Sequence, residues 1–439
     1  MKKFLQMALS LLSVLLLLQM ISCSDDDNPT SPPTPIQTAI KIVVKSSLDS
    51  SMIQNSNVVI FSAETKEAYL RDLSDADGNA YFDCEEGNYY VELAAQGFDP
   101  SPAPNVTPIP FYVMEHDTTT KTYYLNSNPV ANSSYVLGLV EPAVNNVLIQ
   151  AVASSGTEKY ATVSGPDGFF ILYNLPDNDY SYQALKSGFK LDTVTVIGVT
   201  TPLYPDGLYD SLTVEISPYA GSALSGSVSF LATTDTLDVD IVLRDPITMA
   251  VIPGMITREI GGNYSLDSIP DGDFIAWASF ENDGYVMDPD WIFKNPDGLD
   301  LSFPTNNTPL NFSLTGSINM ISPTNPADSI YAFEADSLVP TFSWGPYPST
   351  KEWIIEVRDL NGNVIWGGFD ASGIVQHQQI SKDTYSIEYN FDGSASANLV
   401  PGNIYQWKIY ADDDTALNVQ TLISSSEDLR GIFTVPEGK

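Results

Sequence analysis

The sequence is poor in the residues that most often carry enzyme chemistry. Its 439 residues include two cysteines and two histidines, His116 and His377. A Ser-His-Asp arrangement would have to use one of these histidines, and neither lies beside a nucleophile motif such as Gly-x-Ser-x-Gly. The His and Glu cluster of a catalytic zinc site is also missing. We therefore expect no catalytic centre.

Basic residues are scarce as well. The chain has 19 Lys and Arg against 55 Asp and Glu, and its formal net charge is −36. Such a surface repels nucleic acid, which binds clustered Lys and Arg, so nucleic acid is excluded as a partner. The acidity favours solubility in salt, with cation binding as the alternative. Two carboxyls could also hydrolyse glycosides, but that reaction needs a deep cleft and two separated pKa values.

Long hydrophobic runs and helical periodicity are missing beyond the N-terminus. Aromatic residues make up 11% of the chain, and 30 Pro and 28 Gly are spread along it. This composition is typical of many short strands joined by turns. We predict an all-β protein.

The N-terminal segment has the form of a secretory signal. Lys2 and Lys3 precede an apolar stretch from Phe4 to Ile21, and Cys23 ends the segment. The alternative is a single membrane-spanning helix, because an apolar run of this length could just cross a bilayer. The following residues, 24–37, are acidic and then rich in Pro, so we expect an unfolded tether.

The residues around Cys23 resemble a bacterial lipobox, in which the cysteine is lipidated and becomes the mature N-terminus. This resemblance implies that a lipid anchor attaches the protein to a membrane. The acidic run Asp25–Asp27 resembles the export signal of Bacteroidetes-type surface lipoproteins, although a solvated linker would look similar. We therefore expect an outer-membrane, surface-exposed protein. With Cys23 lipidated, Cys84 has no disulfide partner and is predicted to be a small core residue.

One stretch, Asp77–Phe98, returns at Asp167–Phe189 and more loosely at Gly262–Tyr285. In each copy, apolar residues alternate after a turn glycine, as they do along a strand with one buried face. A second strand follows. The aligned positions are Gly78, Gly168 and Gly262; Ala80, Phe170 and Tyr264; Phe82, Leu172 and Leu266; Cys84, Leu175 and Ile269; and Tyr89, Tyr180 and Phe274.

These copies resemble the carboxypeptidase regulatory-like, or transthyretin-like, β-sandwich. The resemblance is carried by Asp77-Gly78, Gly87-Asn88-Tyr89 and Gly97-Phe98; by Asp167-Gly168-Phe169-Phe170, Leu175-Pro176 and Gly188-Phe189; and by Ile269-Pro270-Asp271-Gly272 and Gly284-Tyr285. It implies a module that is usually non-catalytic and serves as a spacer, folding aid or binding platform, and some relatives bind starch-like glycans. The expected sandwiches span residues 38–126, 133–217 and 222–316.

From Ile318 the pattern changes. Leu399–Trp407 resembles a fibronectin type III strand with its tyrosine corner at Tyr405. Trp353 is expected in the core, because Ile355 and Val357 follow it at strand spacing. We predict that residues 318–436 form a fourth sandwich of the fibronectin III or Ig type.

The sequence contains one candidate cation loop. Asp75, Asp77 and Asn79 present oxygens at alternate positions, which suits Ca²⁺. The bidentate Glu of a typical calcium loop is missing, and Asp and Gly also form tight turns. We therefore expect no cofactor, with Ca²⁺ at this loop as the alternative.

Four aromatic residues are candidates for stacking against a sugar. Trp291 lies beside carboxylates in an apparent insertion, and Trp366, Tyr204 and Tyr209 lie in comparable loops. The alternative is that these side chains anchor loops onto the sandwiches. The expected function is a non-catalytic cell-surface lipoprotein that acts as an adhesive or structural scaffold toward a glycan or a surface or matrix protein. A carbohydrate-binding lipoprotein of a polysaccharide-uptake system is the alternative, and an enzyme or hydrolase accessory is the third hypothesis.

Overall fold

The computed structural model describes residues 38–102, 108–130, 132–154, 158–192, 195–199, 212–230, 239–257, 262–280, 284–289, 299–304, 309–326, 332–370, 372–414 and 421–436. Within these ranges, no apolar helix is long enough to cross a membrane. The predicted signal, Cys23 and the tether lie outside the described residues. The regular structure is made of strands, so the predicted all-β class is confirmed.

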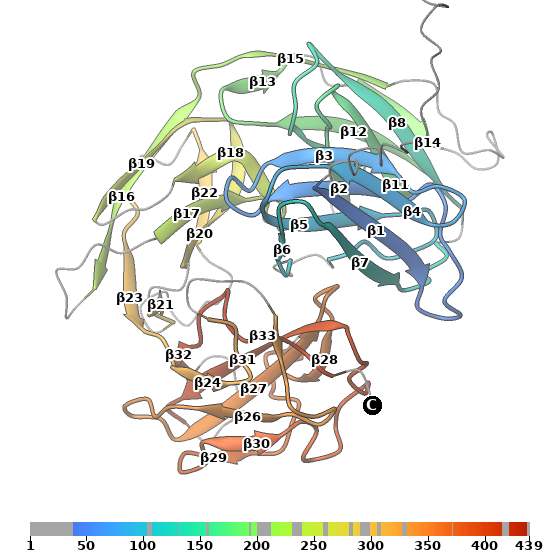
Figure 1. Cartoon of the computed structure of the whole chain (residues 1–439). Coiled ribbons are helices and arrows are strands. Elements are labelled where there is room, and N and C mark those ends of the chain that lie inside the picture. Colours follow the sequence, from blue (N-terminus) through green and yellow to red (C-terminus); the bar gives the residue numbers. More distant parts are fainter. Residues whose placement is uncertain are drawn as a thin grey trace, which may run out of the picture. The chain divides into compact units, whose positions relative to one another are not determined.

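The first sandwich pairs a sheet of order β4-β1-β7 with one of order β3-β2-β5-β6 (Figure 1). Its strands are β1 (Ala39–Ser46), β2 (Asn57–Ser62), β3 (Ala68–Leu73), β4 (Asn79–Asp83), β5 (Gly87–Ala94), β6 (Phe111–Val113) and β7 (Thr118–Leu125). Strands β1 and β7, the first and the last, pair in parallel.

The second and third sandwiches repeat this topology, with parallel pairing of β8 with β15 and of β16 with β23. Their sheets have the orders β11-β8-β15-β13 with β10-β9-β12-β14, and β19-β16-β23-β21 with β18-β17-β20-β22. The strands of the second are β8 (Ser133–Glu141), β9 (Leu148–Ala153), β10 (Lys159–Val163), β11 (Phe169–Pro176), β12 (Asn178–Leu185), β13 (Phe189–Leu191), β14 (Thr195–Val199) and β15 (Leu212–Pro218). Those of the third are β16 (Ser222–Phe230), β17 (Val239–Arg244), β18 (Val251–Thr257), β19 (Asn263–Ile269), β20 (Gly272–Phe280), β21 (Tyr285–Met287), β22 (Leu299–Phe303) and β23 (Phe312–Gly316).

The repeated motif forms the turn and the two strands that were expected. Gly78 and Gly168 have φ of 70° and 78°. A Cβ at Gly78 would lie 2.6 Å from the Val44 carbonyl oxygen, so the turn needs glycine for both conformation and space. In the second strand, Tyr89 and Tyr180 are buried, and their hydroxyls donate to the carbonyls four residues earlier at 3.0 and 2.9 Å. The predicted apolar positions Ala80, Phe82, Phe170, Leu172, Tyr264 and Leu266 are all buried. The alternation is strict in the first and third copies, whereas in the second Ile171 is buried as well.

The fourth sandwich has a different topology. A sheet of order β24-β26-β30 faces one of order β25-β33-β31-β27-β28, to which β29 and β32 add. Its strands are β24 (Met320–Ser322), β25 (Phe333–Glu334), β26 (Thr341–Trp344), β27 (Glu352–Asp359), β28 (Val364–Gly367), β29 (Ile380–Ser381), β30 (Ser386–Glu388), β31 (Ile404–Asp412), β32 (Leu422–Ser425) and β33 (Ile432–Thr434).

The core of the fourth sandwich is aromatic. Trp344, Trp353 and Trp407 are each 1% exposed or less, and Trp344 contacts both of the others ring to ring. The predicted core position of Trp353 is therefore confirmed. The Tyr405 hydroxyl accepts the backbone N–H of Val400 at 2.8 Å, which is the bond of a tyrosine corner.

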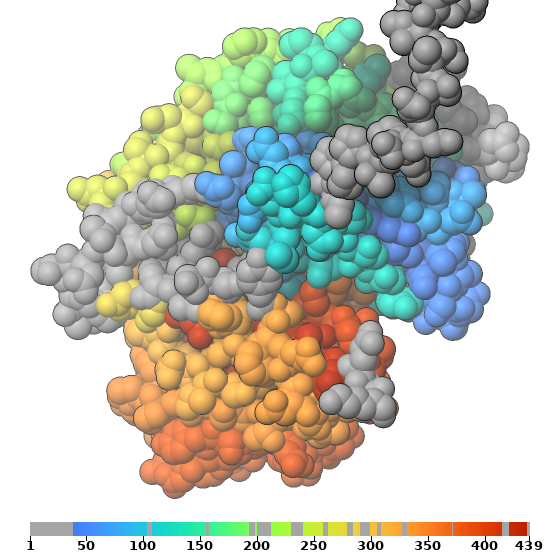
Figure 2. All heavy atoms as spheres, viewed as in Figure 1, coloured from blue at the N-terminus to red at the C-terminus, as the bar shows by residue number. Residues whose placement is uncertain are grey.

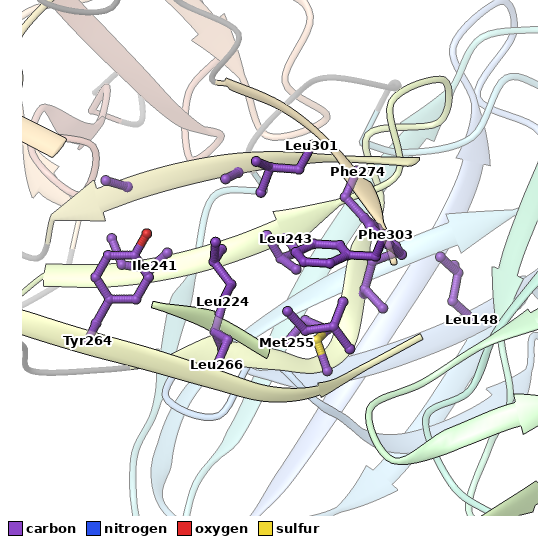
Figure 3. Close-up of a cluster of buried hydrophobic side chains, with 14 of the residues drawn as sticks. Leu148, Leu224, Ile241, Leu243, Met255, Tyr264, Leu266, Phe274, Leu301 and Phe303 are labelled. Carbon is purple, nitrogen blue, oxygen red and sulfur yellow. The ribbon is translucent and has the colours of Figure 1, made fainter. Parts of the chain in front are cut away.

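Residues 38–439 group into one unit by their contacts. One hydrophobic cluster explains much of this cohesion, because it contains Val59 and Tyr90 from the first sandwich, Leu148 from the second and the interior of the third. Figure 3 shows Leu148 beside Phe274 and Phe303, with Met255 and Leu243 adjoining. The outer face of the sheet β3-β2-β5-β6 is thus part of a shared core.

Candidate functional site at the junctions of the sandwiches

The glycine that closes each copy of the motif lies at a junction with the next sandwich. The backbone N–H of Gly97 donates to Asn174 Oδ1 at 2.7 Å, and that of Gly188 donates to the Ser268 carbonyl at 3.0 Å. The N–H of Gly284 donates to Glu427 Oε1 at 3.1 Å. The same repeat position therefore joins the first sandwich to the second, the second to the third and the third to the fourth.

The carbonyl of each junction glycine binds the linker that leaves its own sandwich. The glycines have φ of 81°, 75° and 87°, in the left-handed region that favours glycine. This conformation directs the N–H toward the next sandwich and the carbonyl toward the linker. The donors to Gly97, Gly188 and Gly284 are the N–H groups of Asn128, Tyr219 and Ser317, at 2.9, 2.8 and 2.8 Å.

Asn174 is the most heavily bonded side chain at the first junction. It lies where the register of β11 against β8 shifts, with φ of 58°, a conformation that Asn tolerates better than most residues. Its Nδ2 donates to the carbonyls of Phe98 at 2.8 Å and Ala95 at 3.2 Å, while Oδ1 accepts Gly97 N–H. An amide carries both donor and acceptor groups, so one side chain holds the whole turn.

Two further asparagines hold the edge strand β3 against the second sandwich. Asn145 Nδ2 donates to the Ala68 carbonyl at 2.9 Å, and Asn146 Oδ1 accepts the Ala68 N–H at 3.1 Å. On the same strand the Arg71 guanidinium lies 4.4 Å from the centre of the Phe169 ring. The backbone of an edge strand is thereby paired instead of exposed.

Buried ion pairs connect the third sandwich to the other two. Lys159 Nζ lies 3.1 Å from Asp245 Oδ2, and Lys66 Nζ lies 3.7 Å from Asp240 Oδ2. Burial acts to raise the pKa of Asp245, but hydrogen bonds from the Thr248 N–H and from Lys159 hold it below its usual value. A carboxylate at this junction therefore stays ionised and paired.

The first sandwich also contacts the fourth. Ser101 Oγ donates to Asn361 Oδ1 at 2.8 Å, and Asn361 Nδ2 donates to the Tyr124 carbonyl at 2.9 Å. Ile109 packs with Ile432. These contacts join the blue-to-cyan and the orange-to-red parts of Figure 2. The series of contacts between the sandwiches is therefore closed, from the first through the fourth and back to the first.

A pocket of about 500 Å³ opens where the first three sandwiches meet. Its wall combines Val59 and Glu92 of the first sandwich, strand β10 of the second and the hairpin Ile247–Ala250 of the third. Burial raises the pKa of Glu92 to about 7. The pocket can accept an apolar group that carries a hydrogen-bond donor for Glu92.

The structure corrects the prediction for Trp366. Its side chain is 1% exposed, and its indole N–H donates to Asp392 Oδ1 at 3.0 Å. Trp366 lies directly opposite Val357 on the neighbouring strand, so both side chains point into the core. It cannot be an exposed sugar-stacking residue. Trp291, Tyr204 and Tyr209 lie outside the described residues.

The candidate calcium loop has the geometry of a turn. Asp75 Oδ1 accepts the backbone N–H groups of Asp77 at 2.9 Å and Asn79 at 2.8 Å. These bonds occupy the oxygen that the hypothesis offered to a cation. Over the described ranges, no group of three His, Cys, Asp or Glu side chains gathers in a geometry that could hold a metal ion. Ca²⁺ binding at this loop stays a prediction.

The contacts of His377, His116 and Cys84 are those of residues that support the fold. His377 is 7% exposed, its Nε2 accepts the Ile355 N–H at 3.1 Å, and its Nδ1 lies 2.6 Å from the Gln378 carbonyl oxygen. His116 is exposed and lies 3.6 Å from Glu115. Cys84 packs against the core of the first sandwich, where burial raises the thiol pKa to about 11 and keeps the thiol protonated at neutral pH.

Sequence reasoning did not identify the junction residues. A signal was present, because the apolar spacing along β11 changes from two residues, Phe170 to Leu172, to three, Leu172 to Leu175. The same change separates Leu266 from Ile269. An increase in the spacing of apolar residues along a strand from two to three indicates a β-bulge. The junction residues Asn174 and Ser268 lie within these bulges.

No protein family and no curated protein matches the sequence. Among solved structures, the chain is similar to the TIE protein of Bacillus anthracis, with 11% identity and a TM-score of 0.17 over 63% of this chain and 50% of that chain. The chain therefore spans half the length of that protein. It is similar to BcpA, the major pilin subunit of Bacillus cereus, with 12% identity and a TM-score of 0.18 over 64% of this chain and 100% of that chain. A streptococcal ancillary pilin aligns with 11% identity and a TM-score of 0.19, covering 63% and 98% of the two chains.

Proposed function

We propose that the chain is a non-catalytic scaffold of the bacterial cell surface, in which residues 38–436 form one stiff body on a lipid anchor at Cys23. The observation that supports this proposal most directly is the repeated junction glycine, which joins each sandwich to the next through the same backbone N–H. A body joined in this way transmits force and holds a distal surface at a fixed distance from its anchor.

The energetics of the junctions support a stiff body. Interfaces between domains are usually polar and permit relative motion unless they are large and hydrophobic. Here a hydrophobic cluster extends across three sandwiches, and Asp240 and Asp245 are almost fully buried against Lys66 and Lys159. Separating the sandwiches would break both ion pairs and would expose the apolar surface of the shared cluster to water, and the exposure of apolar surface is the main cost.

The proposal includes lipidation at Cys23 and exposure at the outer surface of the outer membrane. The lipobox-like residues before Cys23 and the acidic run behind it support lipidation and export to the outer surface of the outer membrane. The strongly negative charge suits a surface exposed to salt water, where self-repulsion maintains solubility. The partner that the scaffold contacts is a glycan or a surface or matrix protein. The carbohydrate-uptake role is the alternative, with Trp291 as its candidate sugar-stacking residue.

The first experiment tests the anchor and the location. Cells producing the full chain are labelled with a radioactive fatty acid and then treated with protease while intact. The wild-type chain and Cys84→Ala should both incorporate label and be cleaved at the surface, whereas Cys23→Ala should lose the label and leave the membrane fraction. Label retained in Cys23→Ala, or protection of the wild-type chain from protease in intact cells, would contradict the proposal.

The second experiment separates the adhesive scaffold from the carbohydrate-binding alternative. Soluble chain lacking the signal is applied to immobilised matrix proteins and to a glycan array, beside Trp291→Ala. Binding to matrix protein that Trp291→Ala leaves unchanged supports the scaffold. Saturable binding of a defined oligosaccharide that disappears in Trp291→Ala would replace it with the carbohydrate-binding function.

A further inference from the structure

The acidic residue Glu92 lies among apolar residues on the outer face of the sheet β3-β2-β5-β6. It is on β5, directly opposite Val59 of β2, so the two side chains project from the same face. The next pair on this face is Phe61 with Tyr90, whose rings stack with their centres 4.9 Å apart. Val59, Phe61 and Tyr90 belong to the hydrophobic cluster that the first three sandwiches share. The Glu92 carboxyl therefore lies at a junction of the sandwiches and is not an ordinary surface charge.

Glu92 lines the pocket of about 500 Å³ where the first three sandwiches meet. The wall around it is mostly apolar, with contributions from all three sandwiches: Val59, Phe98, Ala161, Val163, Met249 and Ala250. Small-molecule sites in proteins have volumes of about 300–1,000 Å³ and combine apolar walls with a few polar groups that orient the ligand. The pocket has the size and the lining of such a site.

The Glu92 carboxyl forms no hydrogen bond or ion pair with the residues that the structure describes. Burial is what raises its pKa to about 7. Two bases of this junction are engaged elsewhere, because Lys159 lies 3.1 Å from Asp245 and Arg71 Nε donates to Asn57 Oδ1 at 2.7 Å. A carboxylate that is removed from water without a partner costs free energy, and a cation in the pocket would remove that cost.

The other charges of the pocket also favour a cation. Its described lining contains the carboxyls of Glu92 and Asp99 and one base, Lys159, whose charge is balanced by Asp245. Asp99 Oδ1 accepts a hydrogen bond from Asn128 Nδ2 at 2.5 Å, so the carboxyl without a partner is that of Glu92. Over the described ranges, no three His, Cys, Asp or Glu side chains gather to hold a metal ion, and the apolar wall offers such an ion no ligands. The chemistry therefore suits an organic cation.

We propose that the pocket binds a small organic ammonium ion, a primary amine on an apolar body, whose N–H groups donate to the Glu92 carboxylate. The apolar wall encloses the body, and Glu92 balances the charge. This site is independent of the lipid anchor and of the partner that the scaffold contacts. Because its wall comes from three sandwiches, the bound ammonium ion stabilises their assembled arrangement by mass action.

The competing explanation is that Glu92 stays protonated in the folded chain and the pocket recognises no charge. A neutral carboxyl accepts a hydrogen bond from an alcohol as readily as from an amine. The two explanations therefore differ in the preference of the pocket for an amine over an alcohol of the same shape.

Isothermal titration calorimetry of the full chain at pH 8 tests the proposal. The probes are phenethylamine, cyclohexylmethylamine and hexylamine, each beside the alcohol with the same carbon skeleton. At least one amine should bind at a single site, with a dissociation constant about ten- to a hundredfold lower than that of its matched alcohol, as expected for a hydrogen bond to a charged group. Absence of binding by all the amines, or equal affinity of amine and alcohol, would overturn the proposal.

Carboxyl variants test the position of the site. Glu92→Gln keeps the shape of the side chain, and it should still fold because it removes a buried charge that has no partner. It should lose the preference for the amine, whereas Glu215→Gln, at an exposed position on β15, should retain it. Loss of the preference in Asp99→Asn, with retention in Glu92→Gln, would refute the assignment to Glu92.

The pH dependence of binding gives a second readout. An alkylammonium ion stays charged from pH 6 to pH 8, as Lys does, whereas Glu92 in the free chain takes up a proton over this range. Binding at pH 6 must release that proton, so the amine affinity should fall roughly tenfold between pH 8 and pH 6. Binding heats in buffers of different ionisation enthalpy measure the proton release. Both effects should vanish in Glu92→Gln, and a wild-type amine affinity that does not change with pH would contradict the proposal.

Discussion

The backbone N–H of Gly97 and the side chain of Asn174 meet at 2.7 Å, although the two residues belong to different sandwiches. Gly97 contributes the left-handed turn, and Asn174 contributes an amide held in a strand bulge. The second and third repeats place Gly188 and Gly284 in the same role. The residues that make the fold of one module are thus also the residues that join it to its neighbour.

Replacing Asn174 should destabilise the whole unit and not only the second sandwich. Asn174→Gly retains the left-handed backbone and removes the three side-chain bonds to Ala95, Gly97 and Phe98. We expect a loss of about 2–4 kcal/mol in the free energy of unfolding. Denaturant unfolding measures this loss. The exposed control Asn88→Gly should cost about 1 kcal/mol or less, and equal losses in the two variants would refute the junction role.

The junction and turn glycines should respond differently to alanine. At Gly97 an added Cβ meets no atom within 4 Å, so Gly97→Ala carries only the strain of its φ of 81°, about 1–2 kcal/mol. At Gly78 the Cβ would lie 2.6 Å from the Val44 oxygen, so Gly78→Ala should lose about 3 kcal/mol or more. Chemical denaturation of both variants provides the comparison, and a greater loss at Gly97 would contradict the geometry.

Glu92 should make stability depend on pH. Burial raises its pKa in the folded chain to about 7, above the value of about 4.3 in the unfolded chain. The folded state therefore holds the proton more tightly, and this contribution to stability is complete below about pH 4 and is lost as the pH rises through 7. Glu92→Gln should be more stable than wild type by about 2–4 kcal/mol at pH 8, with the difference shrinking toward zero near pH 4.

The prediction for Glu92 is tested by measuring the free energy of unfolding of the wild-type chain and of Glu92→Gln at each pH. The difference between the two values isolates Glu92, because the other carboxyls titrate equally in both chains. Glu215, exposed on β15, supplies the matched control Glu215→Gln. If the difference in unfolding free energy between Glu92→Gln and wild type does not change between pH 5 and pH 8, the pKa of the Glu92 carboxyl is not raised in the folded chain.

Trp366→Ala should damage stability and not a sugar site. The indole is buried against Phe342 and Tyr389 and bonded to Asp392, so its removal leaves a large cavity in the fourth sandwich. We expect a loss of about 3–5 kcal/mol, measured by calorimetry. Trp366→Phe should lose less, since a ring is kept. A Trp366→Ala chain with wild-type stability and impaired glycan binding would restore the original stacking hypothesis.

Much of the fold was predictable from local pattern. The alternation from Ala80 to Phe82, and its copies at Phe170 and Tyr264, predicted strands because a sheet with one buried face requires apolar residues at every second position. The short strands β3, β10 and β18 were not predicted. Their sequences lack a clean alternation because β3 and β10 lie at sheet edges and β18 is interrupted by Pro253 and Gly254.

The sequence by itself determined the all-β class, the repeat, the turn glycines and the tyrosine corner at Tyr405, since each depends on neighbours within one module. The tertiary structure decided what depends on partners far along the chain. It placed Trp366 in the core through its register with Val357, and it brought Asn174 to Gly97 and Glu92 to a pocket between three sandwiches. Spacing along a chain specifies which face a side chain occupies, but only strand pairing and packing specify what lies opposite.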